Sequence, residues 1–224
     1  MQADDDAMND AADPPPGYLA APRAEPVAAV LVLHAWWGLN DTTKRVCDRL
    51  AGAGYLAFAP DLYHGQVTSD IAEAETLSGA LDPERARADV GAGLRHLLAR
   101  SGRDEVAVIG FSLGAFFALD LSAAEPERVR AVVLYYGTGP ADFSRARATY
   151  LGNFAEDDPY EPQAQVAELE ADLRAAGRPV QFHHYPGTGH WFAEPDRADA
   201  YDAPAAELAW RRTMTFLDGQ VRRE

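Results

Sequence analysis

Short apolar runs alternate with longer amphipathic segments along most of the 224-residue chain. The segment Val27–Leu33, for example, is apolar at every position, which is typical of a strand buried on both faces of a sheet. We expect strands at residues 27–34, 55–59, 105–109, 129–135, 148–154 and 180–185.

The segments between these runs carry the signals of helix boundaries. Asp82-Pro83-Glu84 places a capping carboxylate before a proline at the first helical position, followed by an acid in the first turn. Val90, Leu94 and Leu97 follow at helical spacing. We expect helices at residues 41–53, 83–98, 112–123, 163–176 and 199–217.

Strands that alternate with helices predict parallel crossovers, and hence an α/β fold with a mostly parallel, doubly wound sheet covered on both faces. In such a sheet a ligand binds at the carboxyl ends of the strands. Residues 1–23 are acidic and contain three consecutive prolines, and we expect a disordered or extended tail there. Because no long insertion interrupts the elements, we expect residues 24–224 to form one domain without a large lid.

Charge and composition narrow the range of functions. The formal net charge of −15 repels phosphate backbones and anionic lipid, and so argues against nucleic-acid and membrane partners. The single cysteine, Cys47, leaves no intramolecular disulfide. The N-terminal residues have neither a positive region nor an apolar core, which argues against a secretory signal and makes a cytoplasmic protein the expectation.

The clearest chemical motif is Gly110-Phe111-Ser112-Leu113-Gly114, a G-x-S-x-G sequence between a predicted strand and a predicted helix. This context is that of a nucleophile elbow, in which the glycines allow a tight turn and the serine is held in a strained conformation with its hydroxyl exposed. The backbone N–H of Leu113, at the helix N-terminus, can then stabilise an oxyanion. The motif therefore predicts Ser112 as a catalytic nucleophile.

A serine nucleophile needs a histidine base that a carboxylate orients, and on this fold both follow the serine along the chain. Of the three histidines after Ser112, His183 and His184 fall on opposite faces of a predicted strand. This placement argues against a metal site made of the three, and we expect no metal. His190 lies in the glycine-rich loop after the last strand, beside two aromatic residues, and is the predicted base.

The acid is expected in the loop after the strand at 148–154, where Glu156, Asp157 and Asp158 are adjacent. Periodicity does not choose among them, although Asp158 precedes a proline and a short turn, as a fixed carboxylate at a strand end would. A second oxyanion donor is expected in the loop after the first long strand, from the backbone N–H of Ala35 or Trp36. Aromatic residues near the strand ends predict an apolar pocket wall, and the candidates for substrate binding are Trp37, Tyr63, Phe111 and Trp191.

With these residues in place, the chain resembles the dienelactone hydrolase family of α/β-hydrolases over about residues 26–218. The resemblance rests on the elbow and on four further motifs: Trp37-Gly38-Leu39-Asn40, Ala59-Pro60-Asp61-Leu62-Tyr63, Asp158-Pro159-Tyr160-Glu161-Pro162 and Gly189-His190-Trp191-Phe192-Ala193. It implies an α/β-hydrolase fold. It also implies that the acid is Asp158, four residues before Pro162, and that Trp36 is the oxyanion donor beside Leu113.

Three positions depart from the best-known members of that family. Those members use a cysteine nucleophile, where this chain has Ser112, and a glutamate in the first strand-end loop, where it has Ala35. They bind an anionic lactone through an arginine shortly after the histidine, and the matching residue here is Glu194. We therefore expect an uncharged or differently anchored ester. The segment before Pro26 is also too short for the full N-terminal hairpin of the family.

These observations lead to the hypothesis of a serine hydrolase that cleaves a small or medium carboxylic ester or lactone through an acyl-enzyme, with no metal or organic cofactor. The expected partner is the small-molecule substrate, and the protein is expected to be a monomer or a homodimer. Cleavage of peptide or thioester bonds by the same residues is one alternative. A binding protein that has kept the fold without turnover is another.

Overall fold

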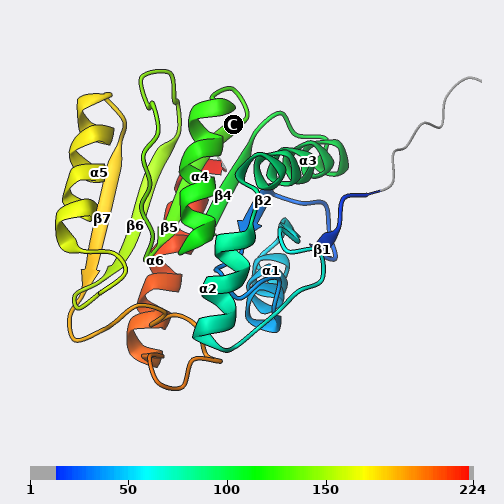
Figure 1. Ribbon diagram of the computed structural model, residues 1–224. Helices are drawn as coiled ribbons and strands as arrows, with labels where there is room; N and C mark the ends of the chain where they lie inside the picture. The colour runs from blue at the N-terminus through cyan, green and yellow to red at the C-terminus, as the bar shows by residue number, and fades with distance from the viewer. Residues whose placement is uncertain (1–13, 222–224) are drawn as a thin grey trace, which may run out of the picture.

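The computed structural model describes residues 14–221, and within them seven strands form one sheet in the order β1-β3-β2-β4-β5-β6-β7 (Figure 1). β1 pairs antiparallel with β3, and every other pairing in the sheet is parallel. The strands are β1 (Gly17–Ala20), β2 (Ala28–Leu33), β3 (Tyr55–Pro60), β4 (Val106–Phe111), β5 (Val129–Tyr135), β6 (Thr149–Ala155) and β7 (Val180–Tyr185).

Helices cover both faces of this sheet. The helices are α1 (Asp41–Gly52), α2 (Ile71–Ala80), α3 (Pro83–Ser101), α4 (Leu113–Ala124), α5 (Gln163–Ala175) and α6 (Ala203–Val221). α3, α4 and α5 pack on one face and α1 and α6 on the other, so that Figure 1 shows α4 and α5 in front of the sheet and α6 behind it. The predicted doubly wound α/β architecture without a large lid is confirmed. Among the described residues, no helix is long and apolar enough to cross a membrane.

The two coverings explain the continuous apolar runs. On β2, Leu31 and Leu33 belong to the core beneath α3 and α4, whereas Val30 and Val32 belong to the core beneath α1 and α6. All four side chains are completely buried. Because both faces of the strand are covered, no position on it is left for a polar residue.

The N-terminal segment adds an edge strand that the hydrophobic pattern does not predict. A Cβ on Gly17 of β1 would lie 2.5 Å from both the Phe58 ring and the Ala59 carbonyl oxygen, so that this close pairing with β3 requires a glycine. The sequence predicts a disordered or extended tail at residues 1–23. Residues 17–20 of that segment are extended, and they pair with β3 as part of the sheet. Residues 1–13 of that segment lie outside the described residues.

Two helices differ from the expectation. The pattern does not predict α2, because Ala74 alone among its residues is buried and the helix has little apolar periodicity. The last helix begins at Ala203 and not at Asp199. Asp202 caps its first turn by accepting the N–H of Ala205 at 2.8 Å.

The start of α3 allows a test of helix capping. The Asp82 side chain accepts the N–H groups of Glu84 and Arg85, and Asp82→Ala leaves both without that acceptor. We expect this variant to lose about 1 kcal/mol of unfolding free energy in chemical denaturation. Asp82→Ser, which retains a capping oxygen, should keep most of the stability. Equal losses in the two variants would contradict the capping role.

Candidate active site

Ser112 lies in the turn between β4 and α4 with φ +47° and ψ −113°, a conformation that L-residues seldom adopt. Close packing enforces this turn. A Cβ on Gly110 would lie 2.4 Å from the Gly114 carbonyl oxygen, and one on Gly114 would lie 2.2 Å from the Leu33 carbonyl oxygen. The predicted tight turn is therefore present, and it places the first residues of α4 directly against the end of β2.

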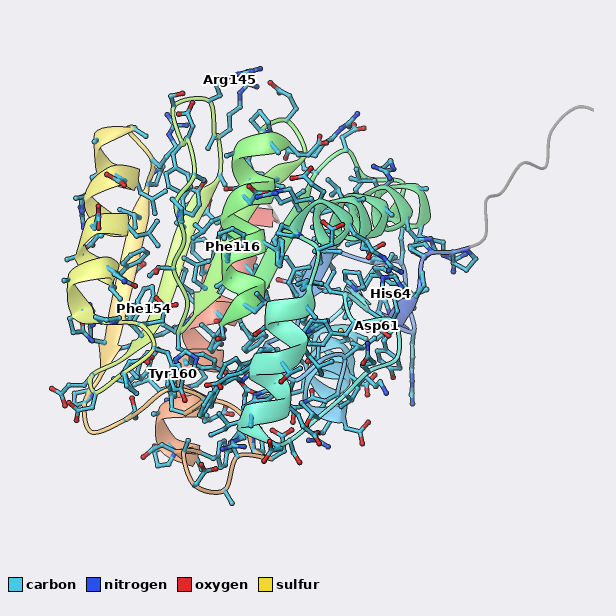
Figure 2. The ribbon with its side chains drawn as sticks, in the orientation of Figure 1. Asp61, His64, Phe116, Arg145, Phe154 and Tyr160 are labelled. Atoms are coloured by element: carbon cyan, nitrogen blue, oxygen red, sulfur yellow. The ribbon has the colours of Figure 1, made fainter. Side chains whose placement is uncertain are left out.

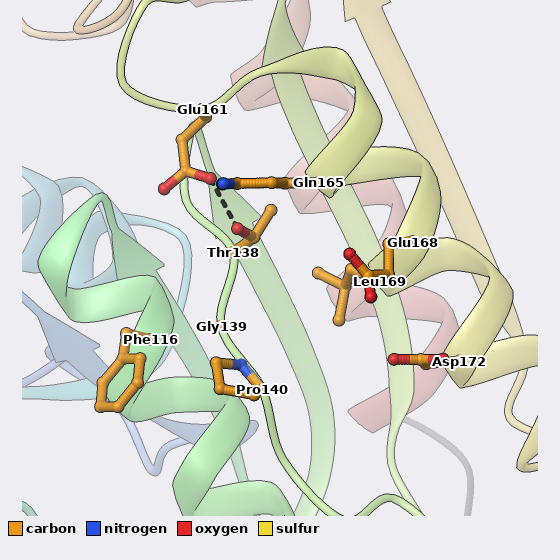
Figure 3. Close-up of a pocket in the computed structure, with 9 residues that line it drawn as sticks. All are labelled: Phe116, Thr138, Gly139, Pro140, Glu161, Gln165, Glu168, Leu169 and Asp172. Carbon is orange, nitrogen blue, oxygen red and sulfur yellow. Dashed lines mark hydrogen bonds between the residues drawn. The ribbon is translucent and has the colours of Figure 1, made fainter.

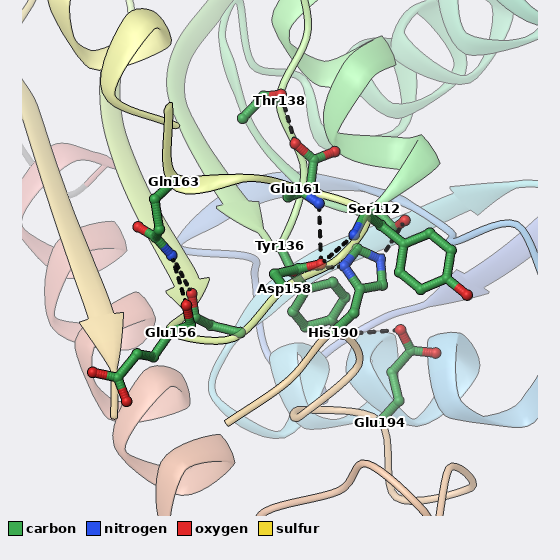
Figure 4. A network of polar contacts seen from close by, with 11 residues as sticks. Ser112, Tyr136, Thr138, Glu156, Asp158, Glu161, Gln163, His190 and Glu194 are labelled. Atoms are coloured by element: carbon green, nitrogen blue, oxygen red, sulfur yellow. Dashed lines mark hydrogen bonds and ion pairs between the residues drawn. The ribbon is translucent and has the colours of Figure 1, made fainter. Parts of the chain in front are cut away.

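A hydrogen-bonded chain links Ser112 to two distant loops (Figure 4). Ser112 Oγ lies 2.9 Å from His190 Nε2, and His190 Nδ1 lies 2.7 Å from Asp158 Oδ2. The side chains of His190 and Asp158 are 3% and 1% exposed. Because the carboxylate accepts at Nδ1, the neutral ring carries its proton there and Nε2 is left to accept from the serine hydroxyl.

Backbone contacts hold the carboxylate in place. Asp158 Oδ1 accepts the N–H groups of Tyr160 and Glu161 at 2.9 and 3.0 Å. The neighbouring Glu156 and Asp157 are exposed. Of the three adjacent acids in this loop, the structure therefore brings Asp158 to the histidine.

The loop that carries Asp158 and the loop that carries His190 are also bonded to each other. The Asp157 N–H donates to the Thr188 carbonyl oxygen at 3.0 Å, and the Gly187 N–H donates to Glu156 Oε2 at 2.8 Å. The two loops follow the neighbouring strands β6 and β7. These two hydrogen bonds hold the loop of Asp158 and the loop of His190 together.

The predicted oxyanion donors lie at the same edge of the sheet. Leu113 is the first residue of α4, where backbone N–H groups have no acceptor within the helix. Trp36 lies in the loop directly after β2, which the first turn of α4 contacts through Gly114. Both N–H groups thus belong to the segments that meet beside Ser112.

His34 anchors the loop that carries Trp36. Its Nδ1 donates to the Ala35 carbonyl oxygen at 2.6 Å, and its Nε2 accepts the Leu62 N–H at 3.2 Å. Burial lowers the pKa of His34, which favours the neutral ring that this pair of bonds requires. From the sequence, His34 is not a candidate for the base because it precedes Ser112. In the structure, its bond to the Leu62 N–H connects the loop after β2 to the loop after β3.

An aromatic group surrounds the histidine. The rings of Trp36, Trp37, Trp191 and Tyr160 contact one another, with centroids 5.0 to 5.7 Å apart. Those of Tyr160 and Trp191 lie 5.0 and 4.9 Å from the His190 ring. In Figure 2, Arg145 lies at the top of the view and Tyr160 in its lower half. The predicted residues Trp36, Trp37 and Trp191 are thus brought together.

Two other predicted wall residues lie apart from this group. Tyr63 is 4% exposed and packs edge-on against the His34 ring at 5.3 Å. Phe111 is 7% exposed and stacks on Tyr135 at 4.7 Å, in the core beneath α1 and α6. Core packing accounts for both residues, and neither joins the rings around His190.

The motifs do not single out Tyr136, which follows β5 with φ +36° and is completely buried. Its ring lies 5.1 Å from the His190 ring, and its hydroxyl donates to Glu194 Oε1 at 2.9 Å. Burial is the main cause that raises the pKa of Glu194 to about 8, so this carboxyl is mostly protonated near neutral pH. Glu194, which the sequence marks as a departure at an arginine position, is therefore a neutral partner of Tyr136.

A cavity of about 410 Å³ lies between α4 and α5 (Figure 3). It is lined by Phe116, Thr138, Gly139, Pro140, Glu161, Gln165, Glu168, Leu169 and Asp172. The preceding residue Gly137 contacts the elbow, since a Cβ there would lie 2.6 Å from the Ser112 carbonyl oxygen. Glu161, which accepts from Thr138 Oγ1 at 2.6 Å, also donates its N–H to Asp158. The cavity therefore adjoins the hydrogen-bonded chain.

The three histidines after Ser112 do not converge. The His183 Nε2 lies 3.1 Å from the Gln181 amide on β7, and His184 is exposed, whereas His190 is bonded to Asp158. Within residues 14–221, no group of three His, Cys, Asp or Glu side chains is placed to hold a metal ion.

Comparisons with known proteins agree with this architecture. A model of the dienelactone hydrolase family matches residues 16–220. The chain is 31% identical over 217 residues to the "Putative carboxymethylenebutenolidase" of Aquifex aeolicus, covering 90% of this chain and 91% of that protein. It is 30% identical over 219 residues to the "Probable 2-oxo-3-(5-oxofuran-2-ylidene)propanoate lactonase" of a Bradyrhizobium species, covering 89% and 87%. The crystal structure of a "Putative Dienelactone Hydrolase" from Klebsiella pneumoniae superposes with a TM-score of 0.76 at 27% identity, over 89% of this chain and 90% of that chain.

The buried carboxyl of Glu194 predicts a pH-dependent stability. Its pKa rises on folding from the usual 4.5 to about 8, so its contribution to stability is fully present below pH 4.5 and is lost as the pH rises through 8. Glu194→Gln has no proton to lose. The unfolding midpoint of this variant, relative to wild type, should therefore rise between about pH 5 and about pH 8 and then level off.

The groups that face this carboxyl are Tyr136, Trp37, Asp196 and Arg197, and all are unchanged in the variant. Glu75→Gln, the same chemical change on the exposed face of α2, serves as the control and should give a difference that hardly changes with pH. If Glu194→Gln behaved like that control, a neutral buried carboxyl would be contradicted.

Proposed function

The chain belongs to the dienelactone hydrolase family and is a carboxylic ester hydrolase, and we propose that it cleaves its ester or lactone with Ser112 as nucleophile, His190 as base and Asp158 as the acid that orients the base. The observation that carries the proposal is the hydrogen-bonded chain of 2.9 and 2.7 Å through the two nitrogens of His190. A serine hydroxyl is a weak nucleophile until a base takes its proton. A histidine that bonds a carboxylate at Nδ1 can accept that proton at Nε2.

In the proposed reaction, His190 Nε2 takes the Ser112 proton as the hydroxyl oxygen attacks the carbonyl carbon. Asp158 stabilises the resulting imidazolium through its bond to Nδ1. Two backbone N–H groups hold its other oxygen in place. The N–H groups of Trp36 and Leu113 stabilise the tetrahedral oxyanion. His190 then returns the proton to the leaving alcohol, and water hydrolyses the acyl-enzyme by the same route.

The surroundings favour a small or medium substrate without a negative charge. The cavity between α4 and α5 has the size of a small-molecule site, at about 410 Å³. Glu161 in its wall donates to Asp158, whereas Ser112, His190 and Asp158 themselves do not line it. Three carboxyl side chains lie in its wall: Glu161, Glu168 and Asp172. These groups and the net charge of −15 of the whole chain would repel an anionic substrate. The lactonase name of the Bradyrhizobium relative supports a lactone as the bond that is cleaved. The propanoate in that name is an anion, so the proposed uncharged substrate would differ from it in charge.

Two other functions are compatible with the same residues. Peptide or thioester cleavage would use the identical chemistry and would differ only in the acyl donor that reacts. A binding protein without turnover would keep the fold with an inactive serine. A fluorophosphonate probe separates the last case, because it labels only an activated serine.

The first test is hydrolysis of p-nitrophenyl esters of increasing acyl length by wild type and Ser112→Ala. We expect wild-type activity and a loss of roughly 10³-fold or more in kcat for the variant, because the nucleophile is removed. The preferred acyl length then measures the pocket. Full activity in Ser112→Ala would overturn the assignment, and inactivity of wild type without probe labelling would favour the binding protein.

A matched pair of variants tests whether Asp158 or Asp157 is the acid that orients His190. Asp158→Asn removes the charge that orients His190 and should lower kcat by roughly 10²- to 10⁴-fold. Asp157→Asn makes the same change at the adjacent, exposed position and should alter kcat by less than about twofold. The reverse ranking would assign the acid to Asp157.

A further inference from the structure

The two hydrogen bonds of His190 do not by themselves fix the rotation of its ring about the line that joins its two bonded nitrogens. Ser112 and Asp158 meet the ring at its two nitrogens, in the ring plane, so a third contact on a ring face is needed to fix the orientation. Besides Trp191, which follows His190 on the same loop at 4.9 Å, two rings from other segments contact it: Tyr160 at 5.0 Å and Tyr136 at 5.1 Å between centroids. Tyr160 is 42% exposed, whereas Tyr136 is completely buried and has far less freedom to move.

Tyr136 is itself held on several sides. Its N–H donates to the Asn153 carbonyl oxygen at 2.9 Å, which fixes its backbone to the end of β6. Its ring packs against Phe192 at 5.5 Å and Phe111 at 6.2 Å. The residue nevertheless has a positive φ of 36°, a conformation that a tyrosine keeps only when its surroundings impose it.

The hydroxyl of Tyr136 connects this rigid strand end to the loop of His190. Its partner Glu194 is 3% exposed and lies four residues after the histidine, in the turn closed by the bond from the Glu194 N–H to the Trp191 carbonyl oxygen at 2.9 Å. Trp191 has a φ of +65°, so the residue next to the histidine is also in an unfavourable conformation. Figure 4 shows His190 and Tyr136 together above Glu194.

We propose that Glu194 is a positioning residue, which accepts the Tyr136 hydroxyl bond and thereby holds the His190 ring in the orientation that meets both Ser112 and Asp158. The inference rests on the proposed function, since it assigns Glu194 a part in the same reaction. Glu194 does not touch the reacting atoms in this assignment. Burial raises the pKa of the Tyr136 phenol well above its usual range, so its hydroxyl keeps the proton that it donates.

The kinetic test separates positioning from substrate binding. Glu194→Ala and Tyr136→Phe each remove the bond and should lower kcat by roughly tenfold or more, with KM changed by less than about threefold. Glu194→Gln keeps an uncharged oxygen acceptor at the same place and should retain kcat within about threefold. The double variant Glu194→Ala/Tyr136→Phe should be no slower than the worse single variant, because the two residues act through one bond.

Tyr150→Phe is the matched control for loss of a buried tyrosine hydroxyl. Its hydroxyl bonds Ser122 at 2.9 Å in the core beneath α3, α4 and α5, away from His190, and the variant should keep wild-type kcat. Thermal unfolding of each variant fixes a temperature at which all are folded, and kcat is compared there. A second readout is the proton NMR signal of His190 Nδ1–H, which should weaken or shift in Tyr136→Phe but not in Tyr150→Phe.

The outcomes distinguish this inference from the proposed function. If Ser112→Ala remains active, the proposed function fails whatever Glu194 does. If Ser112 is essential and folded Glu194→Ala keeps wild-type kcat and an unchanged His190 signal, the positioning role alone is overturned. A rise in KM with unchanged kcat would also overturn it, because that result assigns Glu194 to substrate binding.

Discussion

The contact between the first turn of α4 and the end of β2 is the constraint on which the candidate site depends. The Gly114 Cα lies so close to the Leu33 carbonyl oxygen that a Cβ would come within 2.2 Å of it. This contact accompanies the sharp turn at Ser112 and brings the start of the loop after β2 against the first turn of α4. The strained φ of +47° is thus maintained by the packing of a helix against a completely buried strand. Without that packing, the serine and the N–H groups of Leu113 and Trp36 would have no fixed relation.

A second constraint comes from three buried polar side chains at the site that bond to other segments of the chain. His34, Asn153 and Glu194 are all inside the molecule, and each makes hydrogen bonds to another loop or strand end. An unpaired polar group in this environment costs about 1 to 3 kcal/mol, so each bond also selects one arrangement of the loops that it joins. The bonds of these three side chains therefore help to position the loops that they join.

Glu194 illustrates how one position can serve a different purpose in related chains. The resemblance matches it to an arginine that binds an anionic substrate, but here the side chain turns inward and bonds the Tyr136 hydroxyl. A carboxyl can be buried in this way because it takes up a proton when desolvated, as its raised pKa of about 8 reflects. An arginine has no comparable neutral form near neutral pH, so it would have to stay solvated or find an anion.

The sequence by itself determined the architecture, and it singled out Ser112 and His190 as the nucleophile and base that we propose. Continuous apolar strands between helices permit little other than a covered parallel sheet, and G-x-S-x-G and the loop of His190 are local patterns whose meaning depends on few distant residues. The choice of Asp158 among three adjacent acids came from the family resemblance, and the structure alone places its carboxylate at His190. The Tyr136–Glu194 bond spans 58 positions, and the short β1 pairs with a strand far along the chain. No periodicity or motif in the sequence predicts the Tyr136–Glu194 bond or the pairing of β1 with β3. Both contacts depend on which distant segments the sheet brings together, and only the tertiary structure decides this.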